Sequence, residues 1–218
     1  MKAHLKSIAV PKTWKVKKKQ SKYILRPNPG KKMMYSMPLG LVLKLLGHAK
    51  TAKEVSLILN TKNVLVDGAR RKYPKYPVGL MDIVSISELK EDYQMILDVR
   101  GKLQIVPFKN TSEKACKITG KKLHKGKFQL STFDSRTIIV DNGKDYKTGD
   151  SVVISVPDQK VKGHLKLQKG ANVFLIGGKN IGTKGVVEDL KDEKISVKPE
   201  NEKENVETLK QHAYVVKA

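Results

Sequence analysis

The chain has 218 residues, with 44 Lys and Arg against 21 Asp and Glu, which gives a formal net charge of +23 at pH 7. So much positive charge repels itself in a compact chain unless a polyanion neutralises it, so nucleic acid is the favoured partner and an anionic membrane the alternative. No stretch approaches the roughly 18 uninterrupted apolar residues of a membrane-spanning helix, the first 15 residues lack the apolar core of a secretory signal, and Cys116 has no second cysteine to pair with. We therefore expect a soluble, intracellular protein with no membrane partner.

Residues 1–35 are predicted to be a basic N-terminal arm. The first 53 residues hold 14 Lys or Arg and no acid. Three prolines and the lack of a sustained period argue against a core within the arm, so we expect it to order on its partner. Trp14 is either a stacking platform for an RNA base or a hydrophobic anchor onto the protein body, and the sequence leaves both interpretations open. The predicted RNA-binding residues of the arm are Lys2, Lys6, Lys12, Trp14, Lys15, Lys17, Lys18, Lys19, Lys22, Arg26, Lys31 and Lys32.

Two short helices are predicted next, at the start of a small α+β region spanning residues 36–88. Apolar residues at helical spacing from Leu39 to Leu46 predict a core helix that ends at Gly47. The T-x-x-E sequence from Thr51 to Glu54 is typical of a capping box at the start of a second helix.

The start of the second helix is a candidate phosphate site. Lys50 and Lys53 lie beside it in the sequence, and the free amides and dipole of a helix N-terminus favour an anion. The alternative is a solvated helix start with incidental lysines.

A basic hairpin is predicted between Asn63 and Ile86. Val64 and Val66 face one way and Leu65 the other, Asp67-Gly68 forms a tight turn, and a second strand runs from Met81 to Ile86. We expect Tyr73 and Tyr76 to pack or stack in the loop between the strands. The predicted RNA-binding residues of this region are Lys50, Lys53, Lys62, Arg70, Arg71, Lys72 and Lys75.

These segments resemble a known family. The two helices followed by V-L-V-D-G and Y-P-V-G-L-M-D-I-V-S-I resemble the αL RNA-binding motif of archaeal and eukaryotic small-subunit ribosomal proteins of the S-four-e family. H-L-K-S-I-A-V-P-K-T-W resembles the opening of that family, with Thr13 where histidine is common. R-P-N-P-G-K-K resembles its R-P-x-P-G-P-H, with Lys31 and Lys32 in place of the last Pro and His.

Residues 89–167 are predicted to form a central β domain. T-F-D-S-R-T-I resembles the T-H-D-x-R-T-I of the same family, with Phe133 in place of the histidine. Asp134 and Arg136 are best explained as an ion pair that braces a turn rather than as an acid-base pair. Five β-rich runs separated by glycines carry the prediction, namely Met95–Val99, Leu103–Phe108, Phe128–Thr132, Thr137–Val140 and Ser151–Val156.

Residues 168–218 are predicted to form an SH3-like barrel of the KOW type. Two strands flank a glycine-rich loop whose spacing resembles a KOW motif. Gly177 and Gly182 also have P-loop spacing, but Thr183 precedes Lys184 and a strand rather than a helix follows, which argues against a nucleotide site. The predicted KOW loop residues are Gly177, Gly178, Lys179, Gly182, Lys184 and Gly185.

The sequence offers no motif for catalysis or metal binding. Its histidines are scattered, and the acidic segment Glu188–Glu207 lacks ligand spacing and is best explained as a solvated barrel face. We predict no enzyme activity, no cofactor, no metal and no small-molecule substrate.

The predicted protein is a mixed, mainly β, multi-domain chain of arm, αL domain, central β domain and KOW barrel. The resemblance implies a structural constituent of the small ribosomal subunit in the cytoplasm, with small-subunit rRNA and neighbouring ribosomal proteins as partners. A KOW-containing transcription or translation regulator is the alternative, and an RNA-modifying enzyme is the less favoured one.

Overall fold

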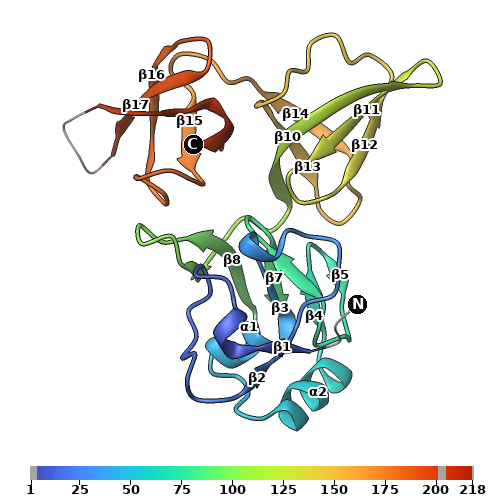
Figure 1. Cartoon of the computed structure of the whole chain (residues 1–218). Coiled ribbons are helices and arrows are strands. Elements are labelled where there is room, and N and C mark those ends of the chain that lie inside the picture. The colour runs from blue at the N-terminus through green and yellow to red at the C-terminus, as the bar shows by residue number, and fades with distance from the viewer. Residues whose placement is uncertain (1–3, 201–204, 218) are drawn as a thin grey trace. The chain divides into compact units, whose positions relative to one another are not determined.

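The computed structural model describes residues 4–200 and 205–217 (Figure 1). The chain divides into two compact units, each described here by itself. The first comprises the residues up to 96 together with 102–112, and the second comprises 97–101 and the residues from 113 onward. Strands outnumber helices, which confirms the predicted mixed, mainly β fold with several sheets. None of the helices in the described ranges is long and apolar enough to cross a bilayer.

Within its described residues, the first unit contains two α-helices and three small sheets. Its largest sheet has the order β5-β4-β7-β8-β9, and two-stranded sheets form from β1 with β2 and from β3 with β6. Its elements are β1 (Leu5–Lys6), a 3-10 turn (Ser7–Ala9), β2 (Tyr23–Ile24), a 3-10 turn (Met33–Tyr35), β3 (Ser36–Pro38), α1 (Leu39–Leu45), α2 (Ala52–Thr61), β4 (Val64–Val66), β5 (Ala69–Arg70), β6 (Pro77–Gly79), β7 (Ile83–Ile86), β8 (Glu91–Leu97) and β9 (Leu103–Pro107).

Both predicted helices and the predicted strand pair are present in the first unit. Helix α1 buries Leu39, Val42 and Leu43 on one face, because these residues recur at helical spacing. Strand β4 buries its two valines and pairs antiparallel with β7, so the two apolar runs do form neighbouring strands.

Helix α2 begins with the predicted capping box. The Thr51 hydroxyl accepts from the Glu54 amide at 3.2 Å, and the Glu54 carboxylate accepts from the backbone of Thr51. Val55 and Leu59 are buried, which fixes the inner face of the helix.

The sheet of the first unit continues beyond residue 88, which is the predicted end of the αL region. Strand β7 pairs with β8, since Ile83 lies opposite Gln94 and Ile86 opposite Glu91. The runs predicted at Met95–Val99 and Leu103–Phe108 thus contribute β8 and β9 to this sheet. The four-part division of the chain stays a prediction.

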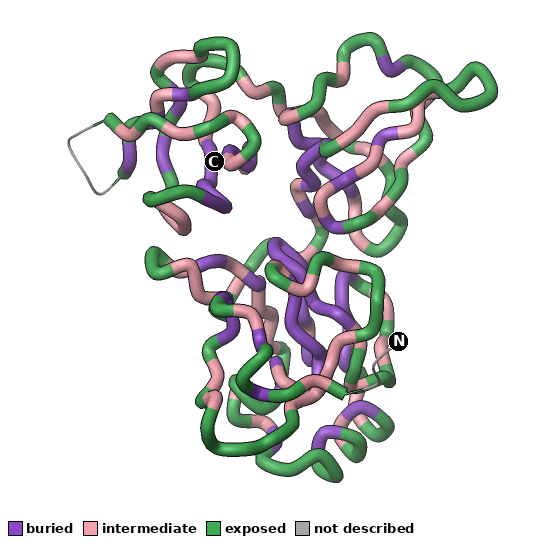
Figure 2. The backbone as a smooth tube through the Cα atoms, viewed as in Figure 1, coloured by how far each residue is buried: buried purple, intermediate pink, exposed green. Residues whose placement is uncertain are grey.

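The second unit consists of two five-stranded antiparallel sheets, with orders β12-β11-β10-β13-β14 and β18-β17-β16-β15-β19. In Figure 2 the buried backbone follows the strands, and the tip of the β10–β11 hairpin is exposed. The elements are β10 (Glu113–His124), β11 (Lys127–Thr132), β12 (Thr137–Val140), β13 (Ser151–Ser155), β14 (Val161–Leu165), β15 (Asn172–Leu175), β16 (Lys184–Leu190), β17 (Lys194–Pro199), β18 (Val206–Leu209), a 3-10 turn (Lys210–His212) and β19 (Ala213–Val215).

The two sheets of the second unit are joined by buried polar contacts between β10 and the C-terminal segment. The Lys117 ammonium donates to the carbonyls of Gln211 at 2.7 Å and Ala213 at 2.5 Å. The Tyr214 hydroxyl donates to the Ala115 carbonyl at 2.7 Å. Burial lowers the pKa of Lys117 to about 8, because these carbonyl partners replace water but carry no full negative charge.

Removing the capping hydroxyl should weaken the first unit. Thr51→Ala should lower the free energy of unfolding by about 1 kcal/mol, since the Glu54 amide loses its acceptor. Thr61→Ala, at the last residue of α2, is the control and should change it less. Chemical denaturation measures both, and equal losses would contradict the importance of the cap.

Lys117 should make stability depend on pH. Its folded pKa lies below its unfolded value, so the unfolded chain binds more protons between pH 8 and 10.5 and stability should rise across this window. Relative to Lys117→Met, the wild type should gain roughly 2–3 kcal/mol by pH 10. Denaturation at several pH values tests this, with Lys122→Met, on the exposed hairpin, as control; parallel profiles for wild type and Lys117→Met would refute it.

Candidate nucleic-acid interface

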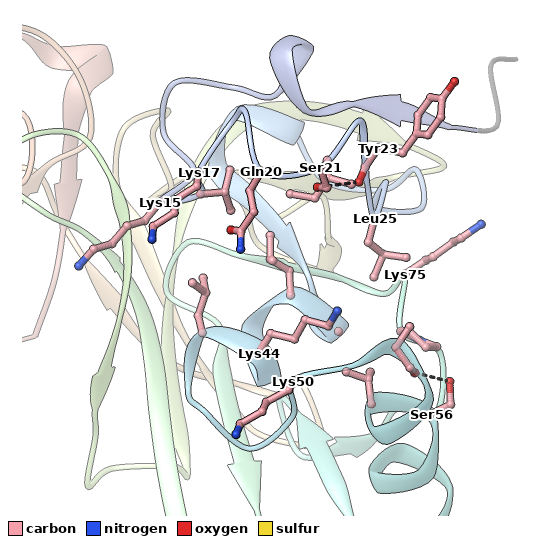
Figure 3. Close-up of a pocket in the computed structure, with 18 of the residues that line it drawn as sticks. Lys15, Lys17, Gln20, Ser21, Tyr23, Leu25, Lys44, Lys50, Ser56 and Lys75 are labelled. Atoms are coloured by element: carbon pink, nitrogen blue, oxygen red, sulfur yellow. Dashed lines mark hydrogen bonds between the residues drawn. The ribbon is translucent and has the colours of Figure 1, made fainter.

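The first unit contains a cavity of about 990 Å³, which we call the arm–helix groove. It is lined by residues of the segment 15–28, by α1, by the start of α2 and by residues 73–75. Figure 3 shows Lys15, Lys17 and Gln20 on the arm side of the groove and Lys44 and Lys50 on the helix side. The groove thus brings together cations that lie up to 60 positions apart in the sequence.

The charged side chains that line the groove are all positive. Five of its lining residues are lysines, and none of the lining residues is acidic. Four of the lysines, all but Lys44, are among the residues predicted from the sequence to bind RNA. Like charges held around one cavity raise the local positive potential and attract an anion. The lining lysines are Lys15, Lys17, Lys44, Lys50 and Lys75.

Backbone hydrogen bonds connect three of the four segments that line the groove. The loop 73–76 accepts from the arm, where the Asn28 amide donates to the Lys75 carbonyl at 2.8 Å. The same loop accepts from the start of α1, since the Leu39 and Gly40 amides donate to its carbonyls, also at 2.8 Å. The end of the arm segment, the loop that carries Lys75 and the start of α1 are therefore linked directly through their backbones.

The N-terminus of α2 already holds a carboxylate. Glu54 accepts from the Lys50 amide at 2.7 Å, and this bond together with those of Thr51 lowers the pKa of the Glu54 carboxyl. A phosphate would compete with that carboxylate for the first amides of the helix. The phosphate site stays a prediction, and it would depend on the exposed side chains of Lys50 and Lys53 more than on free amides.

The predicted tight turn joins β4 to β5. Asp67 and Gly68 both have positive φ, 48° and 70°, the geometry of a type I′ turn. Arg70 follows it and is exposed, with a guanidinium bond to the Asn60 carbonyl at 3.1 Å. The Arg71 guanidinium lies 4.5 Å from the centre of the Tyr76 ring, so this arginine packs within the loop.

The other predicted cations differ in exposure. Lys2 lies outside the described residues. Lys62 is 3.8 Å from the Glu88 carboxylate, a surface pair of small energetic value. The exposed ones are Lys6, Lys12, Lys15, Lys17, Lys19, Lys22, Lys32, Lys50, Lys53, Arg70, Lys72 and Lys75, and the half-buried ones are Lys18, Arg26, Lys31, Lys62 and Arg71.

The described part of the arm, residues 4–35, packs against the rest of the first unit, contrary to the expectation that the arm finds its order on an RNA partner. Trp14 is 0% exposed, and its indole N–H donates to the Met33 carbonyl at 3.2 Å. The Thr13 hydroxyl donates to the Met34 carbonyl at 2.6 Å. Of the two interpretations of Trp14, the structure supports the hydrophobic anchor, because a buried ring offers no face to a base.

Lys31 also has an internal partner. Its ammonium binds the fully buried carboxylate of Asp82, which accepts in addition from the Gly79 amide at 2.8 Å. A buried carboxylate needs such a counter-charge. Lys31 is therefore a structural cation, and its prediction as an RNA contact is corrected.

Trp14→Ala distinguishes the two roles of the tryptophan. Emptying its site should lower the free energy of unfolding of the first unit by about 3–5 kcal/mol. Thermal or chemical denaturation without RNA measures the change. An unchanged transition with weakened RNA binding would instead restore the stacking role.

Two cationic features were missed from the sequence. Lys44 lines the groove, and its place on the outer face of α1, next to buried Leu43, was the available signal. The β10–β11 hairpin has Lys125 and Gly126 at positive φ, again a type I′ turn, so its basic tip projects into solvent. The sequence G-K-K-L-H-K-G-K, with its four lysines and two glycines, could have indicated this basic turn.

The predicted KOW loop connects β15 to β16, and a strand follows it as expected. Added Cβ atoms at Gly177 and Gly185 would collide with the His212 ring and the Lys198 carbonyl. These two glycines therefore serve close packing. The exposed members of the loop are Gly178, Lys179 and Lys184, and Gly182 is half-buried.

Asp134 and Arg136 form the predicted ion pair, at 2.9 Å. Burial of Asp134 opposes ionisation, but the Lys114 ammonium at 3.0 Å, the Thr132 hydroxyl and the guanidinium together lower the pKa of this carboxyl. Burial raises the pKa of the neighbouring Cys116 thiol, which makes it a poor nucleophile. The cluster fits a structural brace of the turn.

Comparisons with known proteins agree with this architecture. Residues 89–161 match the model described as "Ribosomal family S4e", and residues 1–30 match the RS4NT domain. The small ribosomal subunit protein eS4 of Methanococcus aeolicus is 36% identical over 98% of this chain and 93% of its own length. The protein of the same name from Methanocaldococcus jannaschii is 37% identical over 99% of this chain and 94% of its own.

A solved structure is also similar. The crystal structure of the 30S ribosomal protein S4e from Thermoplasma acidophilum gives a TM-score of 0.68 at 28% identity, covering 84% of this chain and 94% of that one. Sequence and fold agree, and the chain belongs to the S4e family of ribosomal proteins.

Proposed function

We propose that the protein is a structural constituent of the small ribosomal subunit in the cytoplasm and that it binds small-subunit rRNA. Its relatives carry the name of small ribosomal subunit proteins. A net charge of +23 is attracted to the negatively charged phosphate backbone of RNA. Neighbouring ribosomal proteins are its other partners. It needs no cofactor or small-molecule substrate for this role.

The arm–helix groove is the observation that carries the RNA contact. It gathers five lysines, and none of its lining residues is acidic. The exposed Arg70 and Lys72 of the basic loop extend the cationic surface of the first unit, and Lys53 adds to it at the start of α2. Phosphate contacts of this kind supply affinity and register, while base contacts supply specificity.

A regulator of transcription or translation is the second candidate. The glycine-rich β15–β16 hairpin favours it, because exposed Lys179 and Lys184 could meet a different RNA or protein. The groove in the first unit would then serve no evident purpose, so we place this role second.

Association with the ribosome tests the proposal directly. The purified protein should co-sediment with small subunits through a salt wash, and crosslinking should attach it to small-subunit rRNA. Crosslinks confined to free messenger RNA, with no co-sedimentation, would support the regulator instead.

The lysines of the groove should dominate the salt dependence of rRNA binding. Replacing Lys15, Lys17 and Lys75 by Gln should flatten the log–log salt slope by about two to three units, since each neutralised phosphate contributes about 0.7–0.9. Filter binding from about 50 to 200 mM salt measures the slope.

The matched control removes the same charge from the second unit. Replacing Lys191, Lys194 and Lys198 by Gln lowers the net charge equally at three exposed lysines. Its slope should stay near that of the wild type. Equal flattening in both variants would mean that net charge, not the groove, governs binding.

A further inference from the structure

Part of the lining of the arm–helix groove is apolar, which phosphate binding does not require, and we call this apolar part the floor. Leu41, Leu45, Leu25 and Val16 all line it, and Leu45 is 42% exposed. Exposed apolar surface inside a concave, cation-rimmed site is stabilised when a ligand covers it.

The floor is preformed. At Gly40 an added Cβ would lie 3.0 Å from the Leu25 side chain and 3.2 Å from those of Pro74 and Val55. Arm, loop and α2 therefore converge on α1 at this point, and a further methyl group would fit only if its neighbours shifted. A ligand would meet a rigid surface and not have to order it.

Side chains that can form hydrogen bonds with the edge of a base also line the groove. Gln20, Asn28 and Ser56 line the groove, and Figure 3 shows the Gln20 amide directed toward its interior. Tyr73, also a lining residue, is 74% exposed and leaves a ring available for stacking. Flat apolar faces, polar edges and a negative backbone are the combination found in unpaired nucleotides.

We propose that the arm–helix groove holds an unpaired nucleotide of the bound RNA, with its base against the apolar floor and its flanking phosphates on Lys15, Lys17 and Lys44. This rests on the proposed RNA binding and specifies its form. A duplex would present its phosphates, sugars and groove edges, but the faces of its bases are stacked inside and could not reach Leu41 or Leu45. An acidic peptide would pair with the lysines. It would give no role to the exposed Tyr73 ring or to the side-chain amides of Gln20 and Asn28.

Abasic RNA separates base insertion from phosphate attraction. The full chain should bind a short single-stranded oligoribonucleotide about tenfold or more tightly than an abasic oligomer of equal length and charge, as judged by fluorescence anisotropy at low salt. Equal affinities for the two would overturn the inference. Stronger binding of poly-glutamate than of either RNA would overturn it in favour of an acidic protein partner.

Matched variants locate the effect. Leu45→Ser should reduce the preference for the base-containing oligomer several-fold, whereas Leu57→Ser, at a 62% exposed leucine of α2 outside the groove, should leave it unchanged. Lys44→Gln should weaken both oligomers, and Lys53→Gln, at an exposed lysine outside the lining, should weaken them less. A preference that survives Leu45→Ser in a folded variant would place the base elsewhere.

Failure of this inference and failure of the proposed function look different. If the chain co-sediments with small subunits but does not discriminate abasic RNA, the groove binds phosphate alone and the inference is lost while the function stands. If it neither co-sediments nor binds either oligomer, both are lost.

Discussion

The hydrogen bonds of the loop 73–76 are the constraint on which the first unit depends. Through three carbonyls this loop ties the arm at Asn28 and the start of α1 at Leu39 and Gly40 to one short stretch of backbone. The first amides of a helix lack partners within it, so satisfying two of them from the loop also fixes where the helix begins. Segments remote in sequence are thereby held close enough to share one groove.

That arrangement brings the lysines of the groove close together, and the apolar packing of the arm offsets the repulsion between them. Trp14 and Val10 are buried, so the arm contributes apolar contacts while most of its described lysines are exposed. Lys31 does the opposite and turns inward to neutralise Asp82. One segment thus supplies both a counter-charge for the interior and cations for the surface, and only the three-dimensional structure separates the two uses.

Local signals predicted much of the fold. The capping box of α2, the apolar spacing of α1, the Asp67-Gly68 turn and the Asp134–Arg136 pair are all short-range patterns, and all are present. Strand β10 was missed because two of its buried positions are Lys114 and Lys117, whose partners lie 20 or more residues away.

The candidate site was less predictable for the same reason. Its lysines could be named from the acid-free run, but their meeting around one cavity depends on bonds between residues that are distant in the chain. Lys44 was overlooked because its exposed position on α1 does not by itself indicate a binding residue, and Trp14 was ambiguous because its burial depends on the part of the protein against which the arm packs.

The link between β10 and the C-terminal segment has a consequence for the order of folding. The Tyr214 hydroxyl reaches the Ala115 carbonyl across 99 residues, and Lys117 reaches Ala213 across 96. During synthesis from the N-terminus, the sheet of β10 can close on β13 and β14 well before these contacts exist. The first unit has its complete sequence earlier still. The contacts of residues 211–214 therefore close the second unit only after the strands from β10 to β18 have been made.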